Sequence, residues 1–245
     1  MTVRYADDFV VLGRTQDILK VVTPAIEEFL QKRGLSLNPK KTVTTSLRNG
    51  FDFVGFNFKL YPHLRKPLGF MLLVKPSRKS IQKFKDKVKR AFCGRHAEGS
   101  AYDLIYKLNP ILKGWRNHRS HVVSKRLFAK LEWYIWHKCL NWAKKKHPTL
   151  GVKEVLKKYF KTHEGRVLCF YGNKEGKELY LFLLTKVPIK RQKLVRDKNP
   201  YLLENAEYYK KRTRRAAFAG LPKMRYQLLK HRKGVCPVCE QLINP

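Results

Sequence analysis

The sequence feature that most constrains the fold is the stretch Val3-Arg4-Tyr5-Ala6-Asp7-Asp8-Phe9-Val10-Val11 near the start of the chain. Two adjacent carboxylates, Asp7 and Asp8, separate two short runs of β-branched and aromatic residues. This pattern predicts a β-hairpin with the acidic pair at its tip. Carboxylates crowded into a tight turn repel each other unless cations lie between them. The stretch therefore predicts either a divalent-cation site or a turn in which Asp is favoured for local hydrogen bonding.

The charge balance restricts the partners of the chain. Its 245 residues include 54 Lys and Arg against 18 Asp and Glu, a net charge of +36. A surplus of this size repels itself unless a polyanion balances it. Nucleic acid is the expected partner, with an affinity that falls steeply as salt is raised. We expect no membrane partner, because the sequence has no run of about 18 apolar residues that could span one.

The hydrophobic pattern predicts an α+β fold. A helix is expected over Asp17–Arg33, weakened at Pro24, and aromatic residues at every second or third position predict a strand pair over Phe51–Phe58. Further helices are expected over 78–92, from Ser100 to a stop at Asn109-Pro110, and over 124–146. A hairpin with its turn at Gly172–Gly176 is predicted within 165–185, followed by a helix over about 203–219.

The helix over 124–146 predicts a packed bundle. Its apolar ladder repeats at helical spacing, with Lys and Arg between the apolar positions. We expect the aromatic residues of this bundle to face inward and its cations to face outward. The ladder comprises Phe128, Leu131, Ile135, Cys139 and Trp142.

Two motifs carry a resemblance to a known family. Tyr5-Ala6-Asp7-Asp8, with its flanking residues, resembles the palm motif of reverse transcriptases in the group II intron reverse transcriptase/maturase branch. The run Leu108-Asn109-Pro110-Ile111-Leu112-Lys113-Gly114-Trp115 and the tryptophan-rich helix after it resemble the maturase-specific domain, or thumb, of the same proteins. The resemblance extends over essentially the whole chain.

The resemblance implies four regions. Residues 1–75 would be the C-terminal part of the palm, and residues 76–164 a three-helix basic thumb bundle. Residues 165–230 would form a basic hairpin and helix that contact DNA. Residues 231–245 would be the truncated start of an HNH-type endonuclease domain.

The resemblance also implies a catalytic role for Asp7 and Asp8. They would bind two Mg²⁺ ions, one activating the primer 3′-hydroxyl and the other stabilising the pyrophosphate leaving group. The fingers and the third metal-binding Asp of the family have no counterpart in this sequence. RNA-directed DNA polymerase activity is therefore expected only beside the N-terminal half of a split enzyme, and the isolated chain is expected to be inactive.

Basic residues at matching positions imply contact with group II intron RNA, and those within residues 165–230 imply contact with a DNA target. Their density favours phosphate contacts over base readout. A solvated basic surface is the plainer alternative for each. The expected nucleic-acid-binding residues are Tyr5, Lys40, Lys41, Lys113, Arg116, His118, Arg119, Lys125, Arg126, Lys210, Lys211, Arg212, Arg214 and Arg215, with His121 in the same cluster as His118.

The five cysteines do not suggest a disulfide framework. Cys93, Cys139 and Cys169 are expected to be buried thiols. Cys236 and Cys239 have the spacing of half a zinc site, so Zn²⁺ is possible but the ligand set is incomplete. The cysteine usage indicates a reducing compartment, either a bacterial cytoplasm or an organellar matrix or stroma, and the protein is not expected to be secreted.

Three functions remain open from the sequence. The first is a group II intron reverse transcriptase/maturase fragment that binds intron RNA to assist splicing. The second is a non-catalytic basic protein that binds RNA in general. The third, supported only by Cys236 and Cys239, is the remnant of an HNH-type endonuclease.

Overall fold

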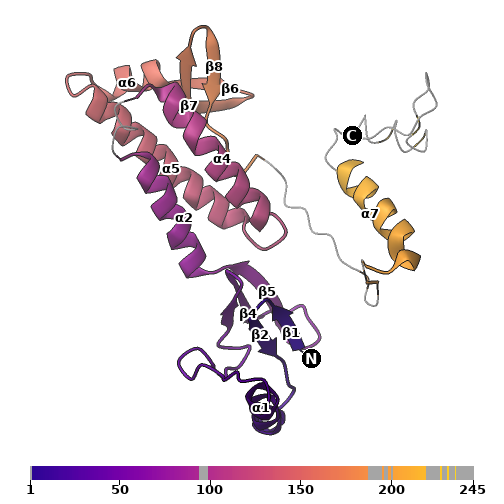
Figure 1. The fold of residues 1–245 in the computed structure, drawn as a ribbon. Helices are drawn as coiled ribbons and strands as arrows, with labels where there is room; N and C mark the ends of the chain where they lie inside the picture. The colour runs from indigo at the N-terminus through magenta and orange to yellow at the C-terminus, as the bar shows by residue number, and fades with distance from the viewer. Residues whose placement is uncertain are drawn as a thin grey trace. The chain divides into compact units, whose positions relative to one another are not determined.

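The computed structural model describes residues 2–93, 99–186, 195, 198–199, 201–218, 227, 231 and 235, and for Gln16 and 214–218 the backbone alone. The chain divides into two compact units, Met1–Lys190 and Arg191–Pro245. Helices and strands are both present in the first unit (Figure 1), so the predicted α+β class is confirmed at that level.

The predicted acidic hairpin is present. Strand β1 (Thr2–Tyr5) pairs with β2 (Asp8–Val11) in antiparallel register, and helix α1 (Gln16–Gln31) follows. Pro24 lies inside α1 without ending it. Its fixed φ is compatible with the helix, although it removes one backbone donor. Gly34, just beyond the helix, has a φ of +68°, the left-handed conformation expected after a helix end.

A three-stranded antiparallel sheet follows in the order β3-β4-β5, formed by β3 (Phe51–Phe53), β4 (Phe56–Pro62) and β5 (Phe70–Pro76). The predicted strand pair is β3 and β4. Val54 and Gly55, with φ of +48° and +79°, form the two-residue turn between them. Strand β5 was not predicted, because its run Phe-Met-Leu-Leu-Val lacks the alternation that marks a half-buried strand.

The described residues that follow include the helices α2 (Arg78–Ala91), α4 (Ala101–Arg119), α5 (Lys125–Lys146) and α6 (Val152–Tyr159). Ser77 caps α2, since its side chain accepts a hydrogen bond from the Ser80 backbone N–H. Ser100 and Asp103 form a capping box at the start of α4. The start predicted for each of the first three helices is confirmed to within one residue.

The predicted stop at Asn109-Pro110 is wrong, because α4 continues through Pro110 to Arg119. Leu104, Leu108 and Leu112 lie on both sides of the proline and are all fully buried. Burying these side chains on one continuous helical face outweighs the local cost of the proline, about 3 kcal/mol in a helix interior.

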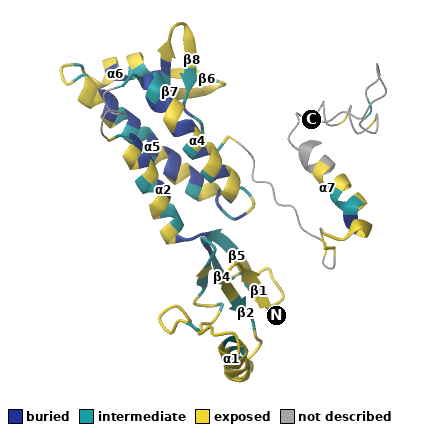
Figure 2. Cartoon of the chain, viewed as in Figure 1, coloured by how far each residue is buried: buried dark blue, intermediate teal, exposed yellow. Residues whose placement is uncertain are grey.

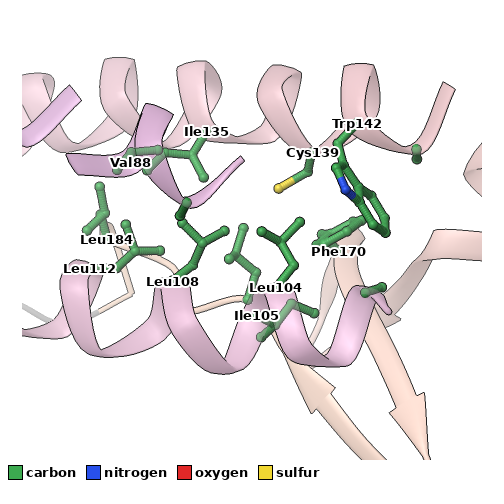
Figure 3. Packing of buried hydrophobic residues seen from close by; sticks show 14 of the residues in the cluster. Val88, Leu104, Ile105, Leu108, Leu112, Ile135, Cys139, Trp142, Phe170 and Leu184 are labelled. Carbon is green, nitrogen blue, oxygen red and sulfur yellow. The ribbon is translucent and has the colours of Figure 1, made fainter. Parts of the chain in front are cut away.

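The core is built from α2, α4, α5 and the strands that follow them. Figure 3 shows Leu104 and Leu108 of α4 on the side that faces Cys139 and Trp142 of α5. The whole apolar ladder predicted for α5 is buried. Figure 2 shows buried positions on the inner side of α2, α4 and α5 and exposed positions on their outer side. Of the three cysteines expected to be buried, Cys139 and Cys169 are buried and Cys93 is exposed.

A second three-stranded sheet, β6 (Phe160–His163), β7 (Arg166–Lys174) and β8 (Lys177–Tyr180), packs on α4. The predicted hairpin is confirmed, but its turn is Glu175-Gly176 and not the longer Gly172–Gly176 segment. The boundary expected between the thumb bundle and the basic hairpin region, at 164/165, falls in the turn between the paired strands β6 and β7. Phe170, Leu181 and Leu184 complete the core formed by the helices.

Three buried polar side chains fasten the segment after β8 to the helices. Asn109 donates from Nδ2 to the Tyr180 carbonyl oxygen at 2.9 Å and accepts from the Phe182 backbone N–H at 2.8 Å. Arg116 donates from Nε to the Leu184 carbonyl oxygen at 3.3 Å. Glu132 accepts from the Thr185 backbone N–H at 3.0 Å and pairs with Arg166. We call Asn109, Arg116 and Glu132 the polar clasp.

The second unit contains the short helix η1 (Leu203–Asn205) and the helix α7 (Ala206–Phe218). Asn205 is buried and donates from Nδ2 to the Asn199 carbonyl oxygen at 3.1 Å. This is the helix expected over about 203–219. Most of the residues expected to begin an endonuclease domain, including Cys236 and Cys239, lie outside the described residues.

Candidate nucleic-acid interface

The tip of the acidic hairpin is the two-residue turn Ala6-Asp7. Ala6 has a φ of +53°, and Asp8 is the first residue of β2, directly opposite Tyr5. The Arg4 Nε donates to the Ala6 carbonyl oxygen at 2.8 Å, which braces the turn. Asp7 and Asp8 are exposed, and Tyr5 retains 62% of its accessible surface.

The two carboxylates alone do not make a two-metal site. Within the described part of the chain, no group of three or more His, Cys, Asp or Glu residues could hold a metal ion. A two-ion site needs more oxygen ligands than two adjacent carboxylates supply. Asp7 and Asp8 are therefore suited to contribute to such a site and do not complete it.

Lys40 and Lys41 lie in a turn organised by Asn38. The Lys40 backbone N–H donates to the Asn38 side-chain oxygen at 3.0 Å, and the Lys41 N–H donates to the Asn38 carbonyl oxygen at 3.0 Å. Both lysines are exposed. The turn thus presents two adjacent cations to solvent. Their contact with phosphate stays a prediction.

Lys113, Lys125 and Arg126 are exposed on the helices, as the sequence predicts. Arg116 differs from them because only 1% of its surface is accessible. Its guanidinium lies 5.2 Å from the centre of the Phe128 ring, and burial lowers its pKa from the ordinary value. The expectation that Arg116 contacts nucleic acid is therefore wrong, since this side chain belongs to the polar clasp.

A cluster of aromatic and basic side chains joins the end of α4 to β4 and α2. We call Phe56, Ser80, His118, Arg119 and His121 the junction cluster. The His118 ring stacks on Phe56 at 5.6 Å, and His121 meets the same ring edge-on at 5.3 Å. Arg119 donates from Nη2 to the Ser80 hydroxyl at 2.7 Å.

Within the junction cluster, the contacts of His118 favour its neutral form. Arg119 Nη1 lies 2.6 Å from His118 Nδ1. Because a guanidinium can only donate, that imidazole nitrogen must accept and carries no proton. Desolvation, followed by the charges of Arg119 and His121, lowers the pKa of His118. These contacts give His118 and Arg119 a structural role beside the predicted contact with nucleic acid.

Helix α7 carries the basic residues expected in the second unit. Lys210 is exposed, and Lys211 forms an ion pair with Glu207 at 2.5 Å. Arg212 is half-buried. Arg214 and Arg215 lie on the same helix, and the structure describes their backbone alone.

Two parts of the first unit match known protein families. Residues 81–160 match the family described as "Group II intron, maturase-specific domain". Residues 1–58 match "Reverse transcriptase (RNA-dependent DNA polymerase)". One segment of the chain is thus similar to reverse transcriptases, and another is similar to the group II intron maturase-specific domain. The resemblance of the chain to the group II intron reverse transcriptase/maturase family is thereby confirmed.

A curated relative supports the same assignment. "Maturase-like protein 1" of Euglena gracilis is 29% identical over 122 residues, which is 49% of this chain and 25% of that protein. The chain thus matches about a quarter of the length of this relative. None of the described helices is both long and apolar enough to cross a membrane.

The family matches follow the structural elements. The maturase-specific match contains nearly all of α2 and the whole of α4, α5 and α6, so it coincides with the helical part of the core. The reverse transcriptase match contains the acidic hairpin, α1, β3 and the start of β4. The two motifs that carried the resemblance therefore fall in separate matches.

Sequence reasoning missed one set of exposed residues. Trp133 of α5 keeps 66% of its accessible surface, although the tryptophans were expected to face inward. Lys130 and Lys144 on the same helix are also exposed. The signal was available in the spacing, because Trp133 lies out of phase with the buried ladder of α5.

Proposed function

We propose that this protein binds group II intron RNA through the outward surface of its maturase-specific helices and thereby assists splicing. The observation that carries the proposal is the coincidence of the maturase-specific match with a helical core whose solvent side is basic. The family match supplies the class of RNA, and the charge distribution supplies the physical means of binding it.

Helix α2 illustrates the basic surface. Its buried face consists of Phe84, Val88 and Ala91, and its other side carries a row of cations. Cations placed this close together repel one another, and phosphates of a bound polyanion would relieve the repulsion. The exposed cations of α2 are Arg78, Lys79, Lys83, Lys87, Lys89 and Arg90.

The test compares group II intron RNA with an unrelated structured RNA of equal length. Binding is measured at about 0.2 M salt, where the nonspecific electrostatic contribution is reduced. Preferential binding of the intron RNA supports the proposal. The double variant K83A/K87A should weaken binding to both RNAs, whereas Lys66→Ala, which removes an exposed lysine between β4 and β5, serves as the control.

Equal affinity for both RNAs would contradict a maturase role. That result would favour the alternative hypothesis, a basic protein that binds RNA in general. Both hypotheses use the same cations, and they differ only in whether the protein recognises the shape of the intron RNA.

We propose DNA synthesis as a second function, conditional on further ligands. The reverse transcriptase match and the exposed Asp7-Asp8 tip favour it, and reverse transcriptases generally use Mg²⁺. Asp7 and Asp8 would supply carboxylates to the metal site, and a separate polypeptide carrying the N-terminal reverse transcriptase half would supply the remaining ligands. A DNA target would contact the basic residues of α7.

Primer extension tests this second function. The chain is assayed alone and with the N-terminal half of a related reverse transcriptase, with and without Mg²⁺. Extension should require both polypeptides and should be lost in Asp7→Ala and Asp8→Ala. Unchanged extension in both variants would show that the acidic tip has no part in synthesis.

Cys236 and Cys239 support an endonuclease or zinc role only by their spacing. We propose that these two thiolates, which are half of a zinc ligand set, do not by themselves hold stoichiometric zinc, and that the protein works in a reducing compartment of a bacterium or organelle. One zinc ion per purified chain, lost in Cys236→Ser, would contradict this assignment. Mg²⁺- or Zn²⁺-dependent cleavage of DNA would favour the endonuclease reading.

A further inference from the structure

Helix α5 has two opposite faces with different chemistry. One face carries the buried ladder from Phe128 to Trp142. At about 100° of rotation per residue, a second set of positions falls along the opposite side of the helix. These six positions, which we call the α5 stripe, are Arg126, Lys130, Trp133, His137, Asn141 and Lys144, and all are exposed except His137, which is half-buried.

The α5 stripe places one aromatic side chain among cations. Arg126 and Lys130 precede Trp133, and Lys144 lies beyond it. The stripe runs from Arg126 to Lys144, a rise of about 27 Å at 1.5 Å per residue, which is long enough for several consecutive nucleotides. No acidic side chain within the described chain lies at ion-pair distance from these three cations. The one acidic residue of α5, Glu132, is engaged in the polar clasp.

Neighbouring rings hold Trp133 in place. Its ring centre lies 4.0 Å from that of His137, and His137 meets the Trp136 ring at 5.0 Å and 84°. Trp136 is fixed in turn, because its Nε1 donates to the Leu168 carbonyl oxygen at 3.1 Å. Trp133 is therefore an exposed aromatic side chain whose conformation is restricted by its neighbours. Less side-chain entropy is lost when a ligand binds to it.

We propose that the α5 stripe binds a single-stranded segment of RNA, with one unpaired base stacked on Trp133 and its phosphates on Arg126, Lys130 and Lys144. Every base has a π-face that can stack on an indole, and cations on both sides follow the phosphate backbone. A protein partner would favour a contiguous apolar patch, whereas Trp133 is flanked by charges along the stripe. The inference rests on the proposed RNA-binding function and names the part of the RNA that this surface recognises.

The test uses the whole chain with a labelled adenosine homopolymer and a fully paired RNA duplex of the same length. Trp133→Ala should weaken homopolymer binding by about 5- to 150-fold, the range for loss of one base–aromatic stack. Trp133→Phe should retain most of the affinity, and duplex binding should be unchanged in both variants. Tyr106→Ala, which removes an aromatic side chain that is 68% exposed on α4, is the matched control and should bind like the parent protein.

Circular dichroism should show an unchanged fold for Trp133→Ala, because this side chain is outside the core. Unchanged homopolymer affinity in Trp133→Ala would overturn the inference, and so would an equal loss on duplex and homopolymer. Self-association that depends on Trp133, measured by sedimentation with RNA affinity unaffected, would also overturn it in favour of a protein interface.

The two proposals fail separately. Preference for intron RNA with no effect of Trp133→Ala refutes the stacking site and leaves the proposed function standing. Homopolymer binding that depends on Trp133, without preference for intron RNA, refutes the maturase role and supports the stacking site.

Discussion

Replacing Asn109 by alanine should destabilise the first unit strongly. Asn109 is only 9% exposed, and its amide makes two hydrogen bonds to the segment that follows β8. Alanine is compatible with helix α4 but has no polar atom. The substitution would leave the Tyr180 carbonyl oxygen and the Phe182 backbone N–H without their partner.

The expected magnitude follows from these two groups. An unsatisfied buried backbone group costs about 1–3 kcal/mol. Two such groups, offset by the better helix propensity of alanine, give an expected loss of about 1.5–5 kcal/mol in the free energy of unfolding.

Urea unfolding followed by circular dichroism measures this loss. The midpoint should fall while the slope of free energy against urea stays constant, since the surface exposed on unfolding is unchanged. The control is Asn117→Ala, which removes an exposed asparagine from the same helix and should change stability by less than about 0.5 kcal/mol. A loss below about 1 kcal/mol in Asn109→Ala would show that the two backbone groups find other partners and do not depend on Asn109.

Two glycine substitutions should have opposite effects on stability in urea unfolding. Gly172→Ala should destabilise the protein by about 1–3 kcal/mol, because a Cβ there would lie 2.2 Å from the Tyr102 backbone nitrogen. Gly114→Ala should stabilise it by about 0.5–1 kcal/mol, because a Cβ at this position of α4 would meet open space. Stability should fall as the pH is lowered through about 6.5, because the pKa of His118 is depressed in the folded state and the unfolded chain binds the proton more readily. His118→Gln should reduce this pH dependence, measured by thermal unfolding between about pH 5 and pH 8. Arg126→Ala should reduce the slope of log affinity against log salt by about 0.7–0.9 in RNA titrations.

Each of these predictions has a contradicting result. Equal stability of the two glycine variants would show that β7 is not pressed against α4 at Gly172. The same pH profile in the parent and in His118→Gln would show that His118 does not titrate between the two states. An unchanged salt slope in Arg126→Ala would mean that this cation does not neutralise a phosphate.

Features set by local chemistry were predictable from the sequence. Ser77 and Ser100 mark helix starts because an N-cap side chain bonds to a backbone N–H within three residues, whatever the rest of the fold does. The acidic hairpin is similarly local, since two β-rich runs and a two-residue turn suffice to describe it. The ladder of α5 followed from helical periodicity alone.

Features decided by tertiary contacts were not predictable. Pro110 is a local stop signal, yet the apolar residues before and after it are buried together, and α4 continues. Strand β5 is a continuous apolar run whose partner, β4, is visible only in the sheet. In both cases the competing signal was the packing of residues distant in sequence.

Two side chains of the candidate site differ from the predicted burial. Cations were expected outside and tryptophans inside, but Arg116 is buried in the polar clasp and Trp133 is exposed on α5. Composition cannot distinguish an arginine that bonds a distant carbonyl oxygen from one that meets solvent. For Trp133, the phase relative to the buried ladder would have given the correct side.

We propose that the helices α2, α4, α5 and α6 recognise group II intron RNA. The most direct measurement is competition binding at about 0.2 M salt, with labelled intron RNA displaced by unlabelled intron RNA or by an unrelated structured RNA. We expect intron RNA to displace the label at a much lower concentration than the unrelated RNA, and K83A/K87A to weaken the complex. Displacement at equal concentrations by both RNAs would contradict it and leave a basic protein that binds RNA through charge alone.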